Sequence, residues 1–382
     1  MKLGVYIHVP FCRKKCDYCS FYSVPVDPAS SAGRAGLRAY CERVGQEARL
    51  RLGGLNGYEI DTVYFGGGTP SLLEPVRVAG ILKTLREIAR VDADAEVTVE
   101  INPEDCFADN LHAFREAGIT RAVLGVQTRD LLLHELIGRS SSVAGDELLD
   151  AFFSVPGIIP CADIIAGIPG QREDGLIADL DSLCSRRARH LSVYLLTIEK
   201  STPLSRRVTY TRNLEETQRG LFEATIGYLT SRGLVHYEIS NFAVPGFESR
   251  HNMKYWKFLP YLGLGAGAHS FIRNKRTMCA MSAEEYLGGD EFRFDEDRRT
   301  PNAAAVEYLL TGLRLLEGVS LAEMEQATGV AISAGLLSRI DSLAEKGLVS
   351  VARKGGDRIV ALSGEGIFQA DGVIYAIAEE YL

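Results

Sequence analysis

Short apolar runs alternate with longer amphipathic segments through the first half of the chain. The apolar runs predict buried parallel strands, and the segments between them have the spacing of helices. The predicted strands cover residues 5–7, 62–65, 97–101, 121–126, 163–165 and 190–197. The predicted helices cover residues 37–52, 78–88, 111–117 and 148–152. Residues 24–36, with their prolines, serines and glycine, are predicted to form a loop.

This alternation predicts the fold class. Strands that are each followed by a helix form a parallel sheet with right-handed crossovers. The simplest closure of such a sheet is a partial (β/α)6 barrel, in which chemistry gathers at the carboxyl ends of the strands. We therefore expect an α/β protein with its polar motifs collected at one end of the barrel.

The carboxyl-terminal part follows a different pattern. Helical spacing over residues 306–316 and 336–348 precedes two short strands around Gly355-Gly356, which predicts a hairpin. We expect residues 1–289 to form the barrel with its extension and residues 290–382 to form a small winged-helix-like α+β domain. Winged helices often bind DNA, but residues 301–382 hold 6 Lys/Arg against 11 Asp/Glu. This charge opposes contact with phosphates, so a lid or a partner-docking module fits better.

Composition narrows the class of protein. The chain has 382 residues, of which 46% are hydrophobic and 24% charged, so it can bury one large core and a satellite domain. A net charge of −8 gives no general attraction to nucleic acid or to anionic membranes. The sequence shows no charged-then-apolar leader and no apolar run near the roughly 20 residues of a membrane helix. We expect a cytoplasmic protein that has no transmembrane segment and does not bind nucleic acid.

The most informative motif is a cage of Cys12, Cys16 and Cys19 with three and then two residues between them. Three cysteine ligands leave one iron of a [4Fe–4S] cluster open to an outside ligand. The natural occupant of that iron is the amino and carboxylate group of S-adenosylmethionine, which the ring of Tyr18 could cover. The alternatives are a chance cluster of cysteines and a structural zinc site. The zinc site needs four ligands, usually in two pairs, and no second pair is visible.

A glycine run follows the second predicted strand. Gly66, Gly67 and Gly68 remove three side chains, so that the backbone can approach a ligand closely. With Thr69 they could hold the methionine part of the cofactor. The run matches neither a Walker loop nor a dinucleotide fingerprint, and the alternative is a tight turn.

Four further polar residues are expected near the same end of the sheet. Glu100 lies on an apolar strand, where a carboxylate is costly to bury without a partner. Gln127 ends the fourth strand, and Arg139 offers a planar donor fork that suits a carboxylate. Asp163 could accept a hydrogen bond from a ribose hydroxyl. Each alone is typical of a helix cap or a salt bridge, whereas together they outline one polar cofactor site.

These motifs resemble the radical S-adenosylmethionine superfamily, in its oxygen-independent coproporphyrinogen III oxidase-like branch. The resemblance spans nearly the whole chain. It rests on the cysteine cage and on segments 64–71, 100–104, 125–127, 165–171 and 237–243. It implies cofactor contacts at Tyr6, Gly67, Gly68, Thr69, Glu100, Gln127, Arg139 and Asp163. Ser140-Ser141 stand where the family has a histidine.

Two departures indicate a subgroup of this branch. The oxidases have a fourth cysteine two positions after the third and a long N-terminal extension. Here Phe21 occupies that position, and only eleven residues precede Cys12. In both features the chain resembles the HemW-type haem chaperones, and residues 251–256 resemble their HNxxYW motif.

The same segment can be considered from its residues alone. His251 next to Tyr255 and Trp256, the one tryptophan of the chain, offers an iron ligand and flat apolar surface for a porphyrin. The alternative is a structural segment that packs its aromatic rings against the barrel. The three residues are our haem candidates, with lesser candidates at His8, His269 and Cys279.

The resemblance thus implies a haem chaperone with a [4Fe–4S] cluster, S-adenosylmethionine and haem as cofactors. Its expected partners are haem or another porphyrin and a recipient haemoprotein. A membrane protein that binds transiently is among the expected recipients. The alternative is a radical enzyme that acts on a porphyrin, either the oxygen-independent coproporphyrinogen III oxidase or a haem-utilisation methyltransferase. Phe21 argues against oxidase activity.

Overall fold

One large β-sheet runs through the first three quarters of the chain in the computed structural model, which describes residues 1–139, 142–297 and 299–382. Its strand order is β14-β13-β12-β11-β1-β4-β5-β6-β7-β8-β10-β9. The central strands are parallel, in the order β11 (Tyr261–Leu264), β1 (Lys2–Val9), β4 (Glu59–Gly67), β5 (Arg90–Ile101), β6 (Arg121–Gln127), β7 (Ile159–Ala166) and β8 (His190–Leu195). Antiparallel strands complete both edges, namely β12 (His269–Ile272), β13 (Lys275–Cys279), β14 (Phe294–Asp297), β10 (Asn241–Ala243) and β9 (Val235–Glu238).

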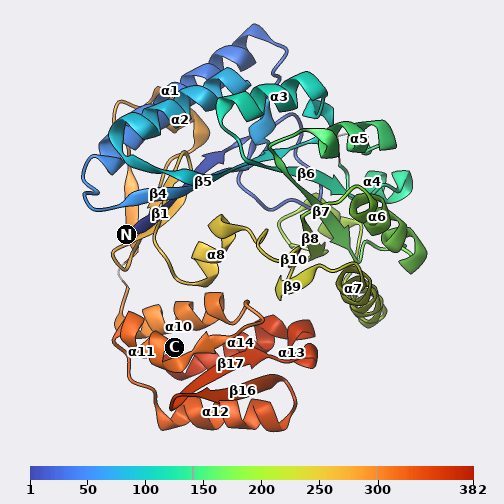
Figure 1. The fold of residues 1–382 in the computed structure, drawn as a ribbon, viewed down its shortest axis with the longest axis vertical. Helices are drawn as coiled ribbons and strands as arrows, with labels where there is room; N and C mark the ends of the chain where they lie inside the picture. The colour runs from blue at the N-terminus through green and yellow to red at the C-terminus, as the bar shows by residue number, and fades with distance from the viewer. Residues whose placement is uncertain (140–141, 298) are drawn as a thin grey trace.

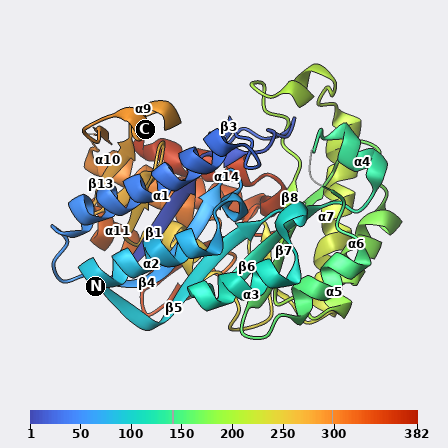
Figure 2. The same ribbon diagram turned by 90° about the horizontal axis from the view of Figure 1, so that it is seen from above.

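Helices cover the convex face of this curved sheet (Figures 1 and 2). They are α1 (Ser31–Leu52), α2 (Pro75–Ile88), α3 (Ala108–Ala117), α4 (Leu131–Leu136), α5 (Asp146–Ser154), α6 (Glu173–Ser185) and α7 (Arg212–Ser231). The apolar side chains of α2 that face the sheet, such as Val78, Leu82 and Leu85, are almost fully buried, as their helical spacing predicts. Every residue of β6 is buried, which explains its nearly continuous apolar run. The predicted α/β partial barrel is confirmed.

The start of α1 differs from the prediction of a loop up to residue 36. The helix begins at Ser31, because the side chain of Ser30 accepts a hydrogen bond from the backbone N–H of Gly33 at 3.0 Å. Such a serine cap satisfies a donor that a helix start otherwise leaves free. The first residues of the helix are small and polar, so the sequence pattern predicted a loop where the helix begins.

A separate small domain follows the sheet and lies below it in Figure 1. Its three-stranded antiparallel sheet has the order β15 (Val319–Ser320), β17 (Asp357–Leu362) and β16 (Val349–Lys354). Its helices are α10 (Pro301–Gly312), α11 (Leu321–Thr328), α12 (Ala334–Glu345), α13 (Gly364–Phe368) and α14 (Ala370–Ala378). They enclose a core of their own around Leu309, Met324 and Ile340. The predicted winged-helix-like α+β architecture is confirmed.

The position of the domain boundary stays a prediction. We expected it after residue 289, but β14 pairs with β13 of the large sheet, with Arg276 opposite Asp297. Because backbone pairing ties this strand to the barrel, we now propose a boundary close to residue 300.

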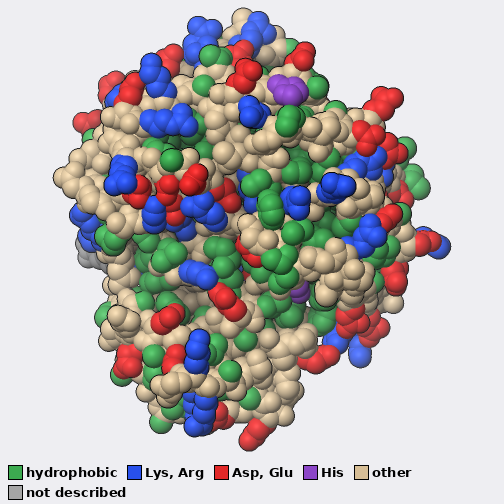
Figure 3. Space-filling view, in the orientation of Figure 1, with side chains coloured by type: hydrophobic (Ala, Val, Ile, Leu, Met, Phe, Trp, Pro, Cys, Tyr) green, Lys and Arg blue, Asp and Glu red, His purple; other side chains and the backbone are tan. Residues whose placement is uncertain are grey.

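Helix α8 (Arg250–Trp256) closes the amino-terminal end of the barrel. The backbone N–H of His251 donates to Glu96 Oε1 at 3.0 Å. A Cβ atom on Gly4 would come within 2.7 Å of the Lys254 side chain, which shows how tightly α8 packs against β1. Figure 3 shows hydrophobic side chains gathered in the hollow between the barrel and the small domain. Among the described residues, no helix is both long and apolar enough to cross a membrane.

Candidate cofactor site

A pocket opens at the carboxyl ends of the parallel strands. It encloses about 410 Å³, which is within the usual range for small-molecule sites. The cluster and cofactor residues that line it are Cys12, Cys16, Tyr18, Cys19, Gly67, Gly68, Thr69, Glu100, Gln127, Arg139 and Asp163. The fold thus brings together every residue predicted for the cluster and S-adenosylmethionine except Tyr6, although the role of each stays a prediction.

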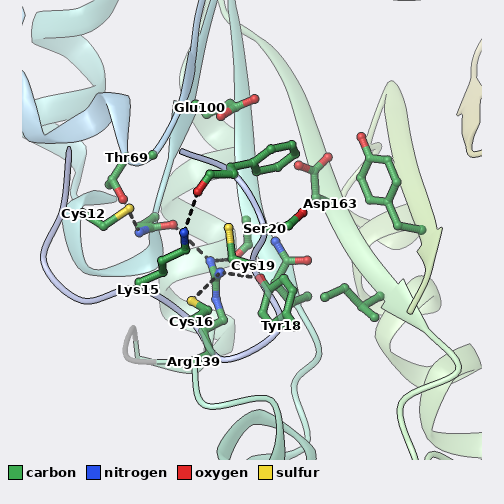
Figure 4. A pocket seen from close by; sticks show the side chains of 18 of the residues that line it. Cys12, Lys15, Cys16, Tyr18, Cys19, Ser20, Thr69, Glu100, Arg139 and Asp163 are labelled. Atoms are coloured by element: carbon green, nitrogen blue, oxygen red, sulfur yellow. Dashed lines mark hydrogen bonds between the residues drawn. The ribbon is translucent and has the colours of Figure 1, made fainter. Parts of the chain in front are cut away.

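The three cysteines lie at one end of the pocket, and Glu100 and Asp163 lie at the other (Figure 4). Cys12 ends the short strand β2 (Phe11–Cys12), and the loop then turns back so that the backbone N–H of Cys19 donates to Cys16 O at 3.2 Å. Burial raises the pKa of the Cys19 thiol, and the neighbouring thiols of Cys16 and Cys12 add to this effect, whereas Lys15 opposes it. Crowding disfavours three negative charges on their own, so a positively charged centre between the sulfur atoms would help the thiols to lose their protons.

No group of three or more His, Cys, Asp or Glu side chains is arranged to hold a single metal ion in the part of the chain that the structure describes.

Arg139 lies under the cysteine loop in a fixed orientation. Its Nη2 donates to Gly125 O at 2.7 Å and to Asn102 Oδ1 at 3.0 Å, and its Nη1 donates to the hydroxyl of Tyr18 at 3.1 Å. Its Nε is buried and has no hydrogen-bond partner among the described residues. A buried charged donor without a partner is costly, so the site fits a ligand that brings an acceptor such as a carboxylate.

The glycine run is required mainly by close contacts within the chain itself. A Cβ atom on Gly68 would lie 2.5 Å from Phe11 O, and Gly67 has a φ of 109°. The backbone N–H groups of Gly68 and Thr69 donate to Val9 O and Phe11 O, both at 2.7 Å. These bonds hold the cysteine loop against the end of β4, so the glycines position the predicted cluster ligands as well as lining the pocket.

Glu100 and Asp163 form a buried carboxyl pair on β5 and β7. Burial, with the nearby Asp163 second, raises the pKa of Glu100 to about 8. Burial also raises the pKa of Asp163 to about 6. Tyr64 donates its hydroxyl to Glu100 Oε1 at 2.8 Å, whereas Asp163 Oδ1 is buried without a partner in the described residues. At neutral pH Asp163 is the ionised member of the pair, and its free oxygen suits a hydroxyl or ammonium donor on a ligand.

Tyr6 does not line this pocket. His8 Nε2 lies 3.0 Å from Tyr22 O, which can only accept, so His8 Nδ1 accepts the hydroxyl of Tyr6 at 3.0 Å. Tyr6 therefore lies deeper in the barrel, with its ring near that of Tyr64. Ser140-Ser141, which replace the family's histidine, lie outside the described residues.

The three haem candidates lie at the opposite end of the barrel. His251 is fully buried, and its Nδ1 and Nε2 form hydrogen bonds with Thr62 Oγ1 at 2.8 Å and with the Tyr255 hydroxyl at 2.9 Å. Burial lowers the pKa of His251 to about 3, so the ring is neutral. Trp256 packs under the guanidinium of Arg314 from the small domain at 4.7 Å. In this conformation neither nitrogen of His251 is free to ligate iron, and its haem role stays a prediction.

Sequence reasoning missed the ion pair that fixes the cysteine loop from the side. Arg13 donates two hydrogen bonds to the carboxylate of Asp105, at 2.6 and 2.9 Å, and Ser71 donates a third at 2.7 Å. These residues come from three separate segments, so no local pattern connects them. Asn102, which contacts both Arg139 and Thr69, was visible only as part of the segment 100–104.

Comparisons with known proteins agree with this geometry. Residues 6–183 match the family profile described as the radical SAM superfamily, and residues 300–356 match the HemN C-terminal domain. The structure of the coproporphyrinogen III oxidase HemN from Escherichia coli superimposes with a TM-score of 0.81 at 20% identity, over 99% of this chain and 90% of that chain. At this identity the likeness shows the fold alone.

Two relatives are similar in sequence over nearly their whole length. Heme chaperone HemW of Mycobacterium tuberculosis is 31% identical over 97% of this chain and 93% of the relative. Heme chaperone HemW of Bacillus subtilis is 30% identical over 91% of this chain and 92% of the relative. The superfamily implies a [4Fe–4S] cluster and S-adenosylmethionine, for which the three thiols, Arg139 Nε and Asp163 Oδ1 supply fitting groups. The chain therefore belongs to the HemW family of the radical SAM superfamily.

Proposed function

We propose that this protein is a haem chaperone, which binds haem and transfers it to recipient haemoproteins. The observation that carries the proposal is the likeness to relatives named heme chaperone HemW, which extends over both the barrel and the small domain. Phe21 supports it, because the oxidases that the chain resembles have a fourth cysteine at that position.

In this proposal different pocket residues bind the cluster and the separate parts of S-adenosylmethionine. Cys12, Cys16 and Cys19 hold the [4Fe–4S] cluster, which supplies one-electron reducing chemistry when it is bound. Arg139 Nε donates to the carboxylate of S-adenosylmethionine, and Asp163 Oδ1 accepts from its ribose. The glycine run keeps the cysteine loop closed over β4, which fixes the distance between the two halves of the site.

A porphyrin-directed radical enzyme is the second candidate. It is favoured by the fold, because the E. coli coproporphyrinogen III oxidase superimposes over almost the whole chain. As an oxidase the protein would remove hydrogen from porphyrinogen propionates and release carbon dioxide; as a haem-utilisation enzyme it would transfer a methyl group or open the ring. The oxidase needs an explanation for Phe21, and the haem chaperone needs none.

One preparation tests both candidates. The protein is reconstituted with iron and sulfide under anaerobic conditions and divided between two assays. Incubation with coproporphyrinogen III, S-adenosylmethionine and a low-potential reductant that reduces the cluster should give no protoporphyrinogen. Titration with haem should saturate at a fixed stoichiometry, and the loaded protein should convert an apo-haemoprotein to its holo form faster than free haem does. Turnover in the first assay, or no saturable binding in the second, would refute the chaperone proposal.

A further inference from the structure

Phe21 places an aromatic ring at the mouth of the cofactor pocket. It lines the pocket, and yet 67% of it is exposed. Tyr194, which lines the same pocket from β8, is also 42% exposed, and Ile165 and Leu195 continue this apolar side. A large apolar side chain gains little from such a position in the folded chain, because little of its surface leaves water. The exposed apolar surface is therefore continuous with the cofactor pocket rather than scattered.

Three consecutive cationic residues lie in the cysteine loop of a chain of net charge −8, and the pocket that they line also holds Glu104 and Glu199. Arg13, Lys14 and Lys15 are consecutive and line the same pocket. Arg13 is held by Asp105 at 2.6 Å, whereas Lys14 and Lys15 are exposed and form no ion pair within the described residues. The ammonium group of Lys15 donates to the backbone carbonyl of Phe21 at 2.8 Å. This bond keeps an ammonium group beside the backbone of Phe21.

We propose that Phe21, Lys14 and Lys15 form the docking face for haem at the mouth of the cofactor pocket. Haem is a flat apolar macrocycle with two propionate groups on one edge. Its face would pack on the ring of Phe21, and its propionates would pair with the two lysines. The inference rests on the proposed haem-chaperone function and deepens it by naming the binding site.

The position of the site explains how binding and release are compatible. Contacts with a ring and with exposed charges would give the haem iron no ligand from this protein, and the haem face turned away from Phe21 would stay open to a ligand from a recipient protein. Exposed ion pairs are individually weak and screened by salt, so the complex dissociates readily. A ligand such as His251 would instead have to give up a hydrogen bond, to Thr62 or to Tyr255, inside the buried interior of the barrel.

Haem titration of substituted full-length proteins tests the inference. The cluster-reconstituted protein is compared with Phe21→Ala, Phe21→Trp and the double substitution Lys14→Glu with Lys15→Glu, by following the Soret difference spectrum. Two matched controls are Tyr375→Ala, an aromatic residue of α14 that is 56% exposed, and Lys83→Glu on the exposed side of α2. All five positions are at the surface, so the folds should be retained, and circular dichroism checks this.

We expect Phe21→Ala to weaken haem affinity about tenfold, because about half of a phenylalanine face is no longer buried on binding. Phe21→Trp should keep the affinity. The double lysine substitution should weaken haem affinity about tenfold at low salt and make the affinity depend less on salt. Haem dimethyl ester, which has no free propionate, should bind to this variant and to wild type with equal affinity. Both controls should bind as wild type does.

The failures of the two proposals are distinguishable. If wild type does not bind haem, the proposed function fails and the docking face fails with it. If wild type binds haem and Phe21→Ala binds it equally well, the docking face alone is overturned. The same holds if the lysine substitutions leave haem binding unchanged and only slow reduction of the cluster by an acidic electron-transfer protein, because the positive charge then serves a protein partner.

Discussion

Replacing Glu100 with glutamine tests the electrostatics of the cofactor pocket. Burial and the nearby Asp163 raise the pKa of Glu100 from 4.5 to about 8. The folded state binds the proton of Glu100 more tightly than the unfolded chain does. The contribution of this proton to the stability of the fold is therefore fully present below about pH 4.5 and is lost as the pH rises through about 8. One unit of pKa is worth about 1.4 kcal/mol, so linkage predicts that Glu100 costs wild type about 3.5 kcal/mol of stability between pH 5 and pH 8. Glutamine cannot ionise, and it can still accept the hydroxyl of Tyr64.

Urea unfolding of the cluster-free protein at pH 5 and at pH 8, under reducing conditions, measures this difference. The free energy of unfolding of wild type should fall more steeply with pH than that of Glu100→Gln, by about 3.5 kcal/mol over this interval. Asp163 is present in both proteins, so its own titration largely cancels. Glu116→Gln on the exposed side of α3 is the control and should follow wild type. Parallel pH dependence in wild type and Glu100→Gln would refute the reasoning.

Three further predictions concern the loop, the glycine run and α8. Alanine at all three cysteines of the cage should abolish the visible iron–sulfur absorbance after reconstitution, and absorbance that persists would show a different ligand set. Gly68→Ala should lower stability by about 2 kcal/mol and weaken S-adenosylmethionine binding in calorimetry, because its Cβ would lie 2.5 Å from Phe11 O; an unchanged melting temperature would contradict this contact. His251→Ala should cost about 3 kcal/mol of stability in urea unfolding, because a fully buried, doubly hydrogen-bonded ring is lost. Its haem affinity should be unchanged, whereas loss of haem binding in a folded variant would restore His251 as the ligand.

The gathering of the predicted site residues in one pocket could be foreseen because they are local or follow from the fold class. Cys12, Cys16 and Cys19 are close together in the chain, so a single loop brings their thiols to one end of the pocket. Glu100 and Asp163 are far apart in sequence, but each lies on a parallel strand, and the carboxyl ends of such strands meet. Tyr6 also lies on such a strand, yet it faces a deeper part of the barrel, because His8 holds its hydroxyl there.

The segment 251–256 shows where sequence reasoning stopped. A histidine among aromatic residues looks like an iron site, and the same composition also suits a buried plug. The choice between them depends on which face of α8 meets the barrel. That face is set by contacts with Thr62 and Glu96, more than 150 residues earlier in the chain, and no local pattern encodes such pairs.

The sequence by itself determined the α/β class, the small C-terminal domain, the thiol cage and the phenylalanine at the position of a fourth cysteine, because spacing and periodicity depend on neighbours along the chain. Only the tertiary structure decided that the glycine run braces the cysteine loop, and that Arg139 and Asp163 line the pocket and each keep a buried polar atom without a partner among the described residues. It also decided that Phe21 stands exposed, with the ammonium group of Lys15 bonded to its backbone carbonyl. Those properties depend on burial and on partners from distant strands, which exist only once the sheet has closed.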